Sequence, residues 1–450
     1  MELTDFNEQH NHNYTEEDRY VVPKQPEVRE SLEAFQDRKF GVMVTWGTYS
    51  QWGIVESWAL PDEDRSWAWH DMDKRVGSHE FRKRYLELVK TFNPVRFRPD
   101  DWAKTFRDAG FQYLIFITKH HDGFSLWDTQ YSDYKITSPE CPYSRNPNAD
   151  ICKVLFDACR EEGIKIHAYF SKPDWHSPYY WAKGFSKDEY MTRNPSYNIE
   201  QHPELWEKFR EYTRSQLLEL VEKYGRLECL WLDGGQVNPA NGQDIRLSEI
   251  MEEARKIQPW LMAADRTVGG ENENFITPEQ LVPDHVIHVP WESCITLGTS
   301  FSYKFDDEYK DARTVIHMLC DIVAKGGNLA LNVGPRPDGL LPAPALPILA
   351  EIGAWLRRNG EAIYGTRPAA PYREGNFAYT GKNGQVYAIY LAPANEKMLP
   401  SILEIPVEGH VEKVSLQGKA MKFTQEGRIL HVMTEHGYDL EPAYVFTLSK

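Results

Sequence analysis

Several short apolar runs in this sequence end in side chains that can do chemistry: carboxylates, imidazoles, a guanidinium and indoles. The closing residues are Thr45-Trp46, Lys119-His120-His121-Asp122, Ser171 with Asp174-Trp175-His176, Trp231-Leu232-Asp233, Asp265-Arg266 and Trp291-Glu292. A single polar residue after an apolar run is usually a turn or capping residue. Six runs that end in this way indicate a shared site. Its inventory matches glycoside hydrolysis, which needs two carboxyl groups at the scissile bond, donors for hydroxyl groups and aromatic walls.

Other chemistries find less support. His120 and His121 are adjacent, and neighbouring side chains on an extended strand point to opposite faces, so both seldom reach one metal ion. No third His or Cys lies at a familiar ligand spacing, so a metal site is the less favoured interpretation. No nucleophile elbow, phosphate loop or dinucleotide fingerprint occurs in its required setting, which leaves acyl, phosphoryl and hydride transfer without support.

The elements that must position these residues follow a repeated pattern. A helix, a glycine and a short β-rich run recur in this order, as in DDWAKTFRDAG followed by FQYLIFIT. The glycine suits a left-handed residue after the last helical turn. Because the β-rich runs are apolar on both faces, they indicate a parallel sheet covered by helices. The predicted strands are 40–45, 112–118, 164–170, 227–232, 260–264, 285–290 and 328–333, and an eighth is not readable.

No glycine-rich phosphate loop follows the first strand, which favours a closed (β/α)8-like TIM barrel over an open doubly wound sheet. The carboxyl ends of barrel strands meet on one face, so the polar closing residues are expected to converge there. After about Gly365 long helical patterns cease, and short strands with an Asn383-Gly384 turn predict a C-terminal antiparallel β-sandwich. The predicted domains are a polar N-terminal segment over 1–30, a catalytic barrel over 31–360 and the sandwich over 366–450.

Composition narrows the class of partner. The 450 residues carry a formal charge of −16, which argues against nucleic acid or an anionic membrane surface and favours a neutral small molecule or glycan. The six cysteines form no CxxC pair, and we expect reduced, buried thiols. No stretch approaches the roughly 20 apolar residues of a membrane span. The N-terminus lacks the features of a signal peptide, so we expect a cytoplasmic protein, or a secreted or periplasmic one whose signal has been removed. The oligomeric state is not indicated.

Taken in order, the motifs resemble the α-L-fucosidases of glycoside hydrolase family 29. The matching segments, within about 38–340, are FGVMVTWGTYS, FITKHHDGFSLWDT, AYFSKPDWHSPYY, LWLDGG, ADRTVGGENENFITPEQ, PWESCITLG and NLALNVGPRPDG. The resemblance implies a barrel followed by a β-sandwich and a retaining double displacement without metal or organic cofactor. It implies release of terminal α-L-fucose, or a related L-sugar such as L-galactose, from a fucosylated oligosaccharide or glycoconjugate.

The resemblance also assigns roles to residues. It implies that Asp233 is the nucleophile and that Glu292 is the acid/base found in one branch of the family. The residues that match sugar-binding positions are Thr45, Trp46, Glu56, Trp58, His120, His121, Tyr169, Trp231 and Arg266. For retention the two carboxyl groups should lie about 5–5.5 Å apart, with the acid protonated and the nucleophile ionised.

Two positions depart from the family pattern. Thr45 stands where family members commonly have a His that contacts the axial hydroxyl of fucose, so a water or a differently substituted sugar would fill the gap. The family's Glu-Trp pair is split here as Glu56-Ser57-Trp58. With these changes, the sequence does not decide whether the sugar is fucose or L-galactose. They also raise a second hypothesis, a glycan-binding protein on the same fold that has lost catalysis.

Overall fold

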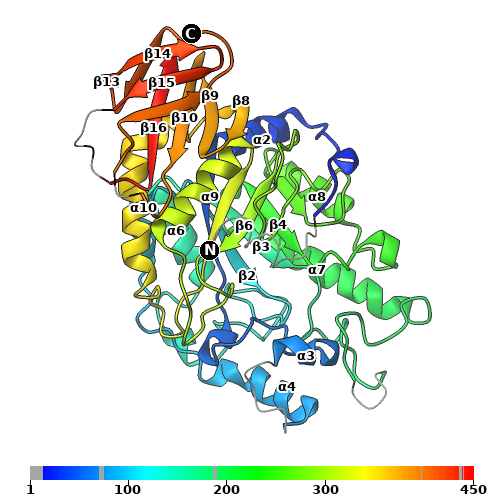
Figure 1. Ribbon diagram of the computed structural model, residues 1–450. Helices are drawn as coiled ribbons and strands as arrows, with labels where there is room; N and C mark the ends of the chain where they lie inside the picture. Colours follow the sequence, from blue (N-terminus) through cyan, green and yellow to red (C-terminus); the bar gives the residue numbers. More distant parts are fainter. Residues whose placement is uncertain are drawn as a thin grey trace.

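A parallel sheet lies at the centre of the larger part of the molecule (Figure 1). The computed structural model describes residues 14–69, 76–185, 190–396, 398–434, 438 and 440–449. Its parallel strands are β1 (Phe40–Val44), β2 (Tyr113–Lys119), β3 (Lys165–Ser171), β4 (Cys229–Asp233), β5 (Met262–Asp265), β6 (Glu292–Thr296) and β7 (Asn328–Val333). Within the described ranges their order is β5-β4-β3-β2-β1-β7-β6. Strand β1 therefore lies inside the sheet, and β5 and β6 form its two edges.

The two edges are joined by a segment that sequence patterns did not identify as a strand. Ala264 of β5 forms an antiparallel bridge with Glu273. A few residues later, Ile276 and Glu279 form parallel bridges with Trp291 and with Cys294 of β6. Residues 273–279 therefore lie between β5 and β6, where an eighth barrel strand would be, and the predicted (β/α)8-like barrel is confirmed.

Six of the seven predicted strands are present within two residues of their predicted bounds. The seventh prediction, 285–290, is wrong: this segment is not a strand, and its His285 and His288 are exposed. Apolar residues alternate there as in a strand, but Pro290 ends the segment and cannot donate a backbone hydrogen bond to a ladder. The strand in this region is β6, which begins at Glu292.

Helices surround the parallel strands (Figure 1). They are α2 (Pro26–Arg38), α3 (Arg65–Ala68), α4 (Ser78–Leu86), α5 (Pro99–Ala109), α6 (Ile151–Glu161), α7 (Pro203–Lys223), α8 (Leu247–Ile257), α9 (Ala312–Ala324) and α10 (Ala345–Asn359). The predicted glycine junctions are present. Gly110 follows α5 with φ of 94°, and the next residue, Phe111, donates its N–H back to Phe106 O at 3.1 Å, which turns the chain into β2.

The N-terminal end of the barrel is closed by α2. Its Phe35 packs against Tyr113 of β2 and Phe275, with ring centroids 5.5 and 4.4 Å apart. Val28 and Leu32 are buried beside it. The predicted polar segment over 1–30 is therefore too long, because an ordered helix begins at Pro26; residues 1–13 lie outside the described part. In the described part of the chain, α2 therefore covers one mouth of the barrel, and the opposite mouth lies at the carboxyl ends of the strands.

The C-terminal part is the predicted antiparallel sandwich and lies beside α9 and α10 (Figure 1). Its strands are β8 (Arg367–Glu374), β9 (Phe377–Lys382), β10 (Gln385–Leu391), β11 (Ile402–Pro406), β12 (Lys413–Leu416), β13 (Lys419–Ala420), β14 (Lys422–Glu426), β15 (Ile429–Met433) and β16 (Ala443–Ser449). They form sheets ordered β13-β12-β16-β10-β9-β8 and β11-β15-β14. Trp355 of α10 donates its indole N–H to Ala443 O at 2.9 Å, which ties the sandwich to the barrel.

Two smaller features complete the description. All six cysteines are buried and unpaired, as predicted from their spacing. Among the described residues, no helix combines the length and the apolar character that crossing a membrane requires.

Candidate active site

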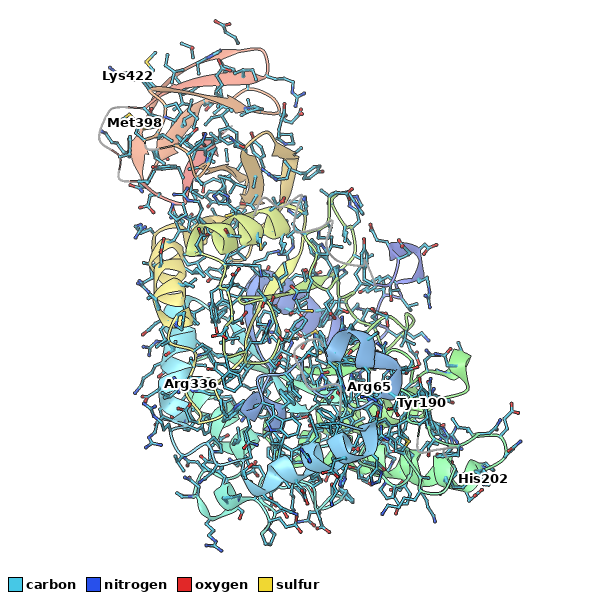
Figure 2. The ribbon with its side chains drawn as sticks, turned by 60° about the horizontal axis from the view of Figure 1, so that its bottom comes forward. Arg65, Tyr190, His202, Arg336, Met398 and Lys422 are labelled. Atoms are coloured by element: carbon cyan, nitrogen blue, oxygen red, sulfur yellow. The ribbon has the colours of Figure 1, made fainter. Side chains whose placement is uncertain are left out.

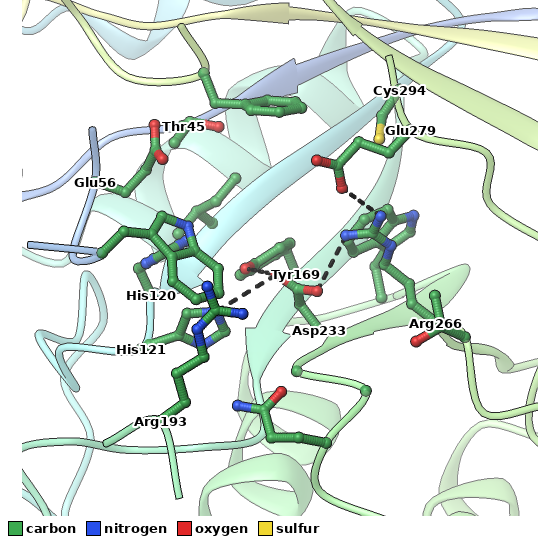
Figure 3. Close-up of a pocket in the computed structure, with 18 of the residues that line it drawn as sticks. Thr45, Glu56, His120, His121, Tyr169, Arg193, Asp233, Arg266, Glu279 and Cys294 are labelled. Carbon is green, nitrogen blue, oxygen red and sulfur yellow. Dashed lines mark hydrogen bonds and ion pairs between the residues drawn. The ribbon is translucent and has the colours of Figure 1, made fainter. Parts of the chain in front are cut away.

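A cavity of about 580 Å³ opens at the carboxyl ends of the barrel strands, where the polar closing residues are predicted to meet (Figure 3). Nine of the eleven predicted site residues line it: Thr45, Glu56, Trp58, His120, His121, Tyr169, Trp231, Asp233 and Arg266. Trp46 and Glu292 are not among the described residues that line this pocket. Convergence of strand ends therefore locates the pocket correctly but does not select every member of its wall.

Asp233 is the last residue of β4, and both of its carboxylate oxygens are held by donors. Tyr169 donates its hydroxyl to Oδ2 at 2.6 Å, and Arg266 donates Nη1 to Oδ1 at 3.0 Å. His121 Nε2 lies 3.7 Å from Oδ2. Burial alone would raise the pKa of Asp233, but Arg266 and His121 hold that pKa well below its usual range. Asp233 is therefore an ionised carboxylate in a fixed orientation.

Trp231 precedes Asp233 by two residues and so faces the barrel interior on the same side of β4. Its ring stacks on that of Tyr169, with centroids 5.3 Å apart and an interplanar angle of 23°. The guanidinium carbon of Arg266 lies 4.8 Å from the Trp231 ring centroid. One indole thus packs against both residues that hold the Asp233 carboxylate.

His120 and His121 both reach the pocket, contrary to the expectation that adjacent side chains diverge. The reason is that β2 ends at Lys119, so the pair lies in the following turn rather than on an extended strand. Their ring centroids are 4.4 Å apart, and Ser57 Oγ hydrogen-bonds His120 Nδ1. Burial lowers the pKa of His121 to about 4 and holds that of His120 well below its usual range, so both rings are neutral at neutral pH.

One ligand atom each from His120, His121 and Asp233 lies within 4.8 Å of the others, so these side chains could surround a small group. Both Asp233 oxygens already accept hydrogen bonds, and the guanidinium of Arg266 places positive charge beside them. Within the described chain neither ring nitrogen of His121 has a hydrogen-bond partner. Sugar hydroxyls, which both donate and accept, fit this set better than a cation that the guanidinium would repel.

The structure resolves the split Glu56-Ser57-Trp58 segment. Glu56 has φ of 32°, a conformation that turns the chain so that Glu56 and Trp58 both line the pocket while Ser57 contacts His120. The Glu56 carboxylate accepts the N–H of Ser302 at 2.7 Å. Burial raises the pKa of Glu56 to about 7, despite that hydrogen bond. A buried carboxyl group with its backbone in a rarely adopted region is typical of a functional position.

The first predicted motif is divided between pocket and core. Thr45 lines the pocket, and its hydroxyl accepts the Asn332 amide N–H at 2.7 Å. Trp46 is wrongly predicted to bind the sugar: its indole donates to Arg336 O at 3.1 Å, and its ring packs 5.2 Å from that of Trp102. Successive residues leave a strand in opposite directions, so Thr45 pointing inward places Trp46 among the outer helices.

Glu292 is also placed differently from its predicted position. It does not close a strand but opens β6, so it lies at the N-terminal end of the barrel and is fully buried. Tyr113 donates its hydroxyl to Oε2 at 2.5 Å, and Trp231 donates its indole N–H to Oε1 at 3.0 Å. Burial raises the pKa of Glu292 to about 7. Cys294, two residues further along the same face of β6, is the residue that reaches the pocket.

Sequence reasoning missed several side chains of the wall, including Trp67, Arg193, Gln236, Glu279 and Phe301. Glu279 is the most important, because the Arg266 guanidinium that holds Asp233 through Nη1 also binds Glu279 Oε2 through Nη2. Its side chain is 38% exposed. A weak sequence signal for Glu279 exists. The apolar pair Phe275-Ile276 precedes Thr277-Pro278-Glu279. If residues 273–279 had been identified as a strand, Glu279 would have been a polar residue at a strand end.

Comparisons with known proteins agree with this geometry. A family model described as alpha-L-fucosidase matches residues 7–361. Tissue alpha-L-fucosidase of Bos taurus is 30% identical over 411 residues, covering 85% of this chain and 79% of that protein. The structure of alpha-L-fucosidase isoenzyme 1 from Paenibacillus thiaminolyticus is 28% identical with a TM-score of 0.75, covering 94% of this chain and 99% of that one. A Bacteroides thetaiotaomicron alpha-L-fucosidase, solved as a trapped covalent intermediate in a glutamate-to-glutamine variant, is 25% identical with a TM-score of 0.76, covering 96% and 98%.

Proposed function

This chain belongs to the α-L-fucosidase family, glycoside hydrolase family 29, and is a retaining glycoside hydrolase; we propose that Asp233 is its nucleophile and Glu279 its acid/base. The substrate is a fucosylated glycan, and the sugar released is α-L-fucose or a closely related L-sugar. The alternative of an inactive glycan-binding protein is not supported. The carboxylates that the chemistry needs are retained in the pocket.

The observation that carries the proposal is the state of Asp233. The carboxylate is ionised, oriented by Tyr169 and Arg266, and placed at the carboxyl end of a barrel strand. In the first step one of its oxygens forms a bond to the anomeric carbon while the bond to the leaving oxygen breaks, and Glu279 gives that oxygen a proton. In the second step Glu279 takes a proton from water, whose oxygen attacks the anomeric carbon as the bond to Asp233 breaks.

Glu279 suits the acid/base role better than Glu292 because of where each carboxyl group lies. Arg266 binds Asp233 and Glu279 at once, so their separation is limited to the reach of one guanidinium, in keeping with the about 5–5.5 Å of retaining enzymes. Glu292 lies on the other side of Trp231, away from the pocket.

The remaining wall suits a hydroxylated ring. We assign Glu56, His120, His121 and Thr45 to its hydroxyl groups, and Trp58, Tyr169 and Trp231 to its faces. Met43, Ile117, Cys294 and Phe301 give the pocket an apolar part that fits the methyl group of a 6-deoxy sugar. All these residues lie within 31–360, so we assign the activity to the barrel and a supporting role to the sandwich.

Hydrolysis of an aryl α-L-fucoside, followed by NMR of the first-formed sugar, tests the proposal. The α-anomer is expected first, and Asp233→Ala should lower kcat by about 10⁴-fold or more. Asp133→Ala, which removes an exposed carboxylate, is the matched control and should retain full activity. Wild-type turnover in Asp233→Ala, or β-fucose as the first product, would overturn the assignment.

A further inference from the structure

A turn at residues 266–268 carries Arg266, whose guanidinium binds both Asp233 and Glu279. Thr267, the middle residue of this turn, has φ of 62°, a conformation that β-branched residues rarely adopt. Such a backbone conformation persists only where its surroundings hold it. The position of the Arg266 guanidinium therefore depends on the groups that hold the turn.

The carboxylate of Glu273, a residue that is 1% exposed, holds this turn. Its Oε1 accepts the N–H of Thr267 at 3.3 Å, and its Oε2 accepts the N–H of Gly269 at 2.7 Å. Glu273 is itself fixed, because it forms an antiparallel bridge with Ala264 of β5. The carboxylate therefore ties the turn to the segment that closes the barrel.

The N-terminal segment supplies a third donor to this carboxylate. Thr15, which is 2% exposed, donates its hydroxyl to Glu273 Oε2 at 2.6 Å. Arg19 donates Nη2 to Val268 O, within the turn itself, at 2.6 Å. These two contacts join residues that lie 258 and 249 positions apart in the sequence. Residues 15–19 are therefore part of the scaffold behind the active site.

We propose that Glu273 is a positioning residue of the reaction: it fixes the turn that carries Arg266, and Thr15 completes its set of hydrogen-bond donors. This inference rests on the proposed function, in which Arg266 serves Asp233 and Glu279. Glu273 is not among the described residues that line the pocket, so it acts through the turn and not on the sugar. Its part in catalysis is to keep one guanidinium within reach of two carboxylates.

Removing the Glu273 carboxylate would release the turn. The N–H groups of Thr267 and Gly269 would lose their acceptor, and the left-handed conformation of Thr267 would lose the contact that holds it. A shift of the turn moves Arg266, and a displacement of about 1 Å can cost about 10²-fold in rate. Glu273→Gln is the informative substitution, because it keeps the side-chain volume and replaces one acceptor oxygen by an NH₂ group that cannot accept an N–H.

A double-mutant cycle tests whether Glu273 acts through Arg266. We expect Glu273→Gln to lower kcat/KM on a dinitrophenyl α-L-fucoside by about tenfold or more. In an enzyme that already carries Arg266→Ala, the same change should cost no more than about threefold, because the group that Glu273 positions is absent. The matched control is Glu271→Gln, at an exposed glutamate two residues away, which should keep the wild-type kcat/KM. Equal losses in the two backgrounds, at a temperature where circular dichroism shows all variants folded, would overturn the proposal.

A second arm uses the N-terminal segment and does not require Glu273→Gln to fold. Thr15→Val removes one of the three donors, so kcat/KM should fall several-fold, whereas Thr15→Ser keeps the hydroxyl and should restore the wild-type value. The matched control is Thr424→Val. Thr424 is exposed on β14, which begins at Lys422, at the end of the molecule away from Arg65 (Figure 2). A lower melting temperature in Thr15→Val with unchanged kcat/KM would make the contact purely structural and overturn the proposal.

This inference and the proposed function fail in different ways. Wild-type turnover in Asp233→Ala would remove the nucleophile that Arg266 holds, and with it the proposed function. If Asp233→Ala is inactive while folded Glu273→Gln and Thr15→Val keep the wild-type kcat/KM, only the positioning role of Glu273 is wrong.

Discussion

The indole N–H of Trp231 donates a 3.0 Å hydrogen bond to Oε1 of Glu292, a carboxyl group at the first residue of β6. The same indole packs against Tyr169 and Arg266, the two residues that hold Asp233, the proposed nucleophile. We therefore infer that Glu292 acts on the site through Trp231, as a positioning residue. This arrangement separates two glutamates, Glu279 and Glu292, whose substitution has different consequences.

Glu279→Gln and Glu292→Gln should respond differently to the leaving group. A dinitrophenyl leaving group needs little acid assistance, whereas a sugar needs a full proton transfer, worth typically 10²–10⁴-fold. Glu279→Gln should therefore lose about 10²-fold or more in kcat/KM on a disaccharide beyond its loss on the dinitrophenyl fucoside. Glu292→Gln should lose rate equally on both substrates. The opposite result would be an equal loss on both substrates for Glu279→Gln and a loss confined to the disaccharide for Glu292→Gln. It would make Glu292 the acid/base and Glu279 the positioning residue.

Glu292 should also make stability depend on pH. Its pKa is about 7 in the folded protein, against about 4.3 in an unfolded chain. Between these values the folded state keeps a proton that the unfolded state has released, so the free energy of unfolding falls as pH rises, by on the order of 3 kcal/mol. Glu56, with a similar folded pKa, adds a fall of the same sign.

Melting temperatures at pH 5 and pH 8 check this dependence. Glu292→Gln keeps an acceptor for the Trp231 N–H and carries no titratable proton, so its melting temperature should fall less between these pH values than that of the wild type. Glu252→Gln, at an exposed position of α8, is the matched control and should behave as the wild type. An identical pH dependence in Glu292→Gln and wild type would show that Glu292 is ionised in the folded protein.

The sequence predicted the barrel because its signals are local. Apolar runs identified six strands, four of them directly after helix-ending glycines. The rule that barrel strands end on one face placed six residues in the pocket, and the family resemblance added Glu56, Trp58 and Tyr169. The same rule misplaced Glu292, because the run before it is a loop and the strand begins at Glu292 itself. A one-element shift moved this carboxyl group from one end of the barrel to the other.

Residues that enter the site from irregular segments had no such signal. Arg193 reaches the pocket mouth from a loop, and only its pairing with Asp64, 129 residues earlier, shows its direction. Several polar strand-end residues instead fix loops. Lys119, for example, donates to Asp174 at 2.7 Å with both side chains buried. Residue type at a strand end indicates chemistry, but only the three-dimensional partners distinguish a catalytic carboxylate from a structural one.

Thr45→Val tests whether this position reads the sugar. The substitution keeps the shape of the side chain and removes the hydroxyl that accepts the Asn332 N–H. If Thr45 also contacts the sugar, kcat/KM should fall about tenfold, and by different factors for an α-L-fucoside and an α-L-galactoside. Loss of the Asn332 hydrogen bond alone would lower the free energy of unfolding by about 1–3 kcal/mol, and with it the melting temperature. The ratio of kcat/KM on the two substrates would then stay unchanged. That second result would remove Thr45 from the specificity-determining residues.

Trp46→Phe and Trp58→Phe form a matched pair, since both are tryptophans of the N-terminal motifs predicted to bind the sugar. Trp58 lines the pocket, with its ring 4.8 Å from that of His121, so Trp58→Phe should raise KM or lower kcat about tenfold with little change in melting temperature. Trp46 donates to Arg336 O within a buried aromatic cluster. Trp46→Phe should therefore lose about 1–3 kcal/mol of stability and keep KM, because it deletes a buried hydrogen bond and leaves a cavity outside the barrel. We therefore expect a kinetic effect only for the tryptophan that lines the pocket, although both belong to motifs predicted to bind the sugar. A raised KM in Trp46→Phe, at a temperature where the variant is fully folded, would contradict the position of the Trp46 indole outside the pocket.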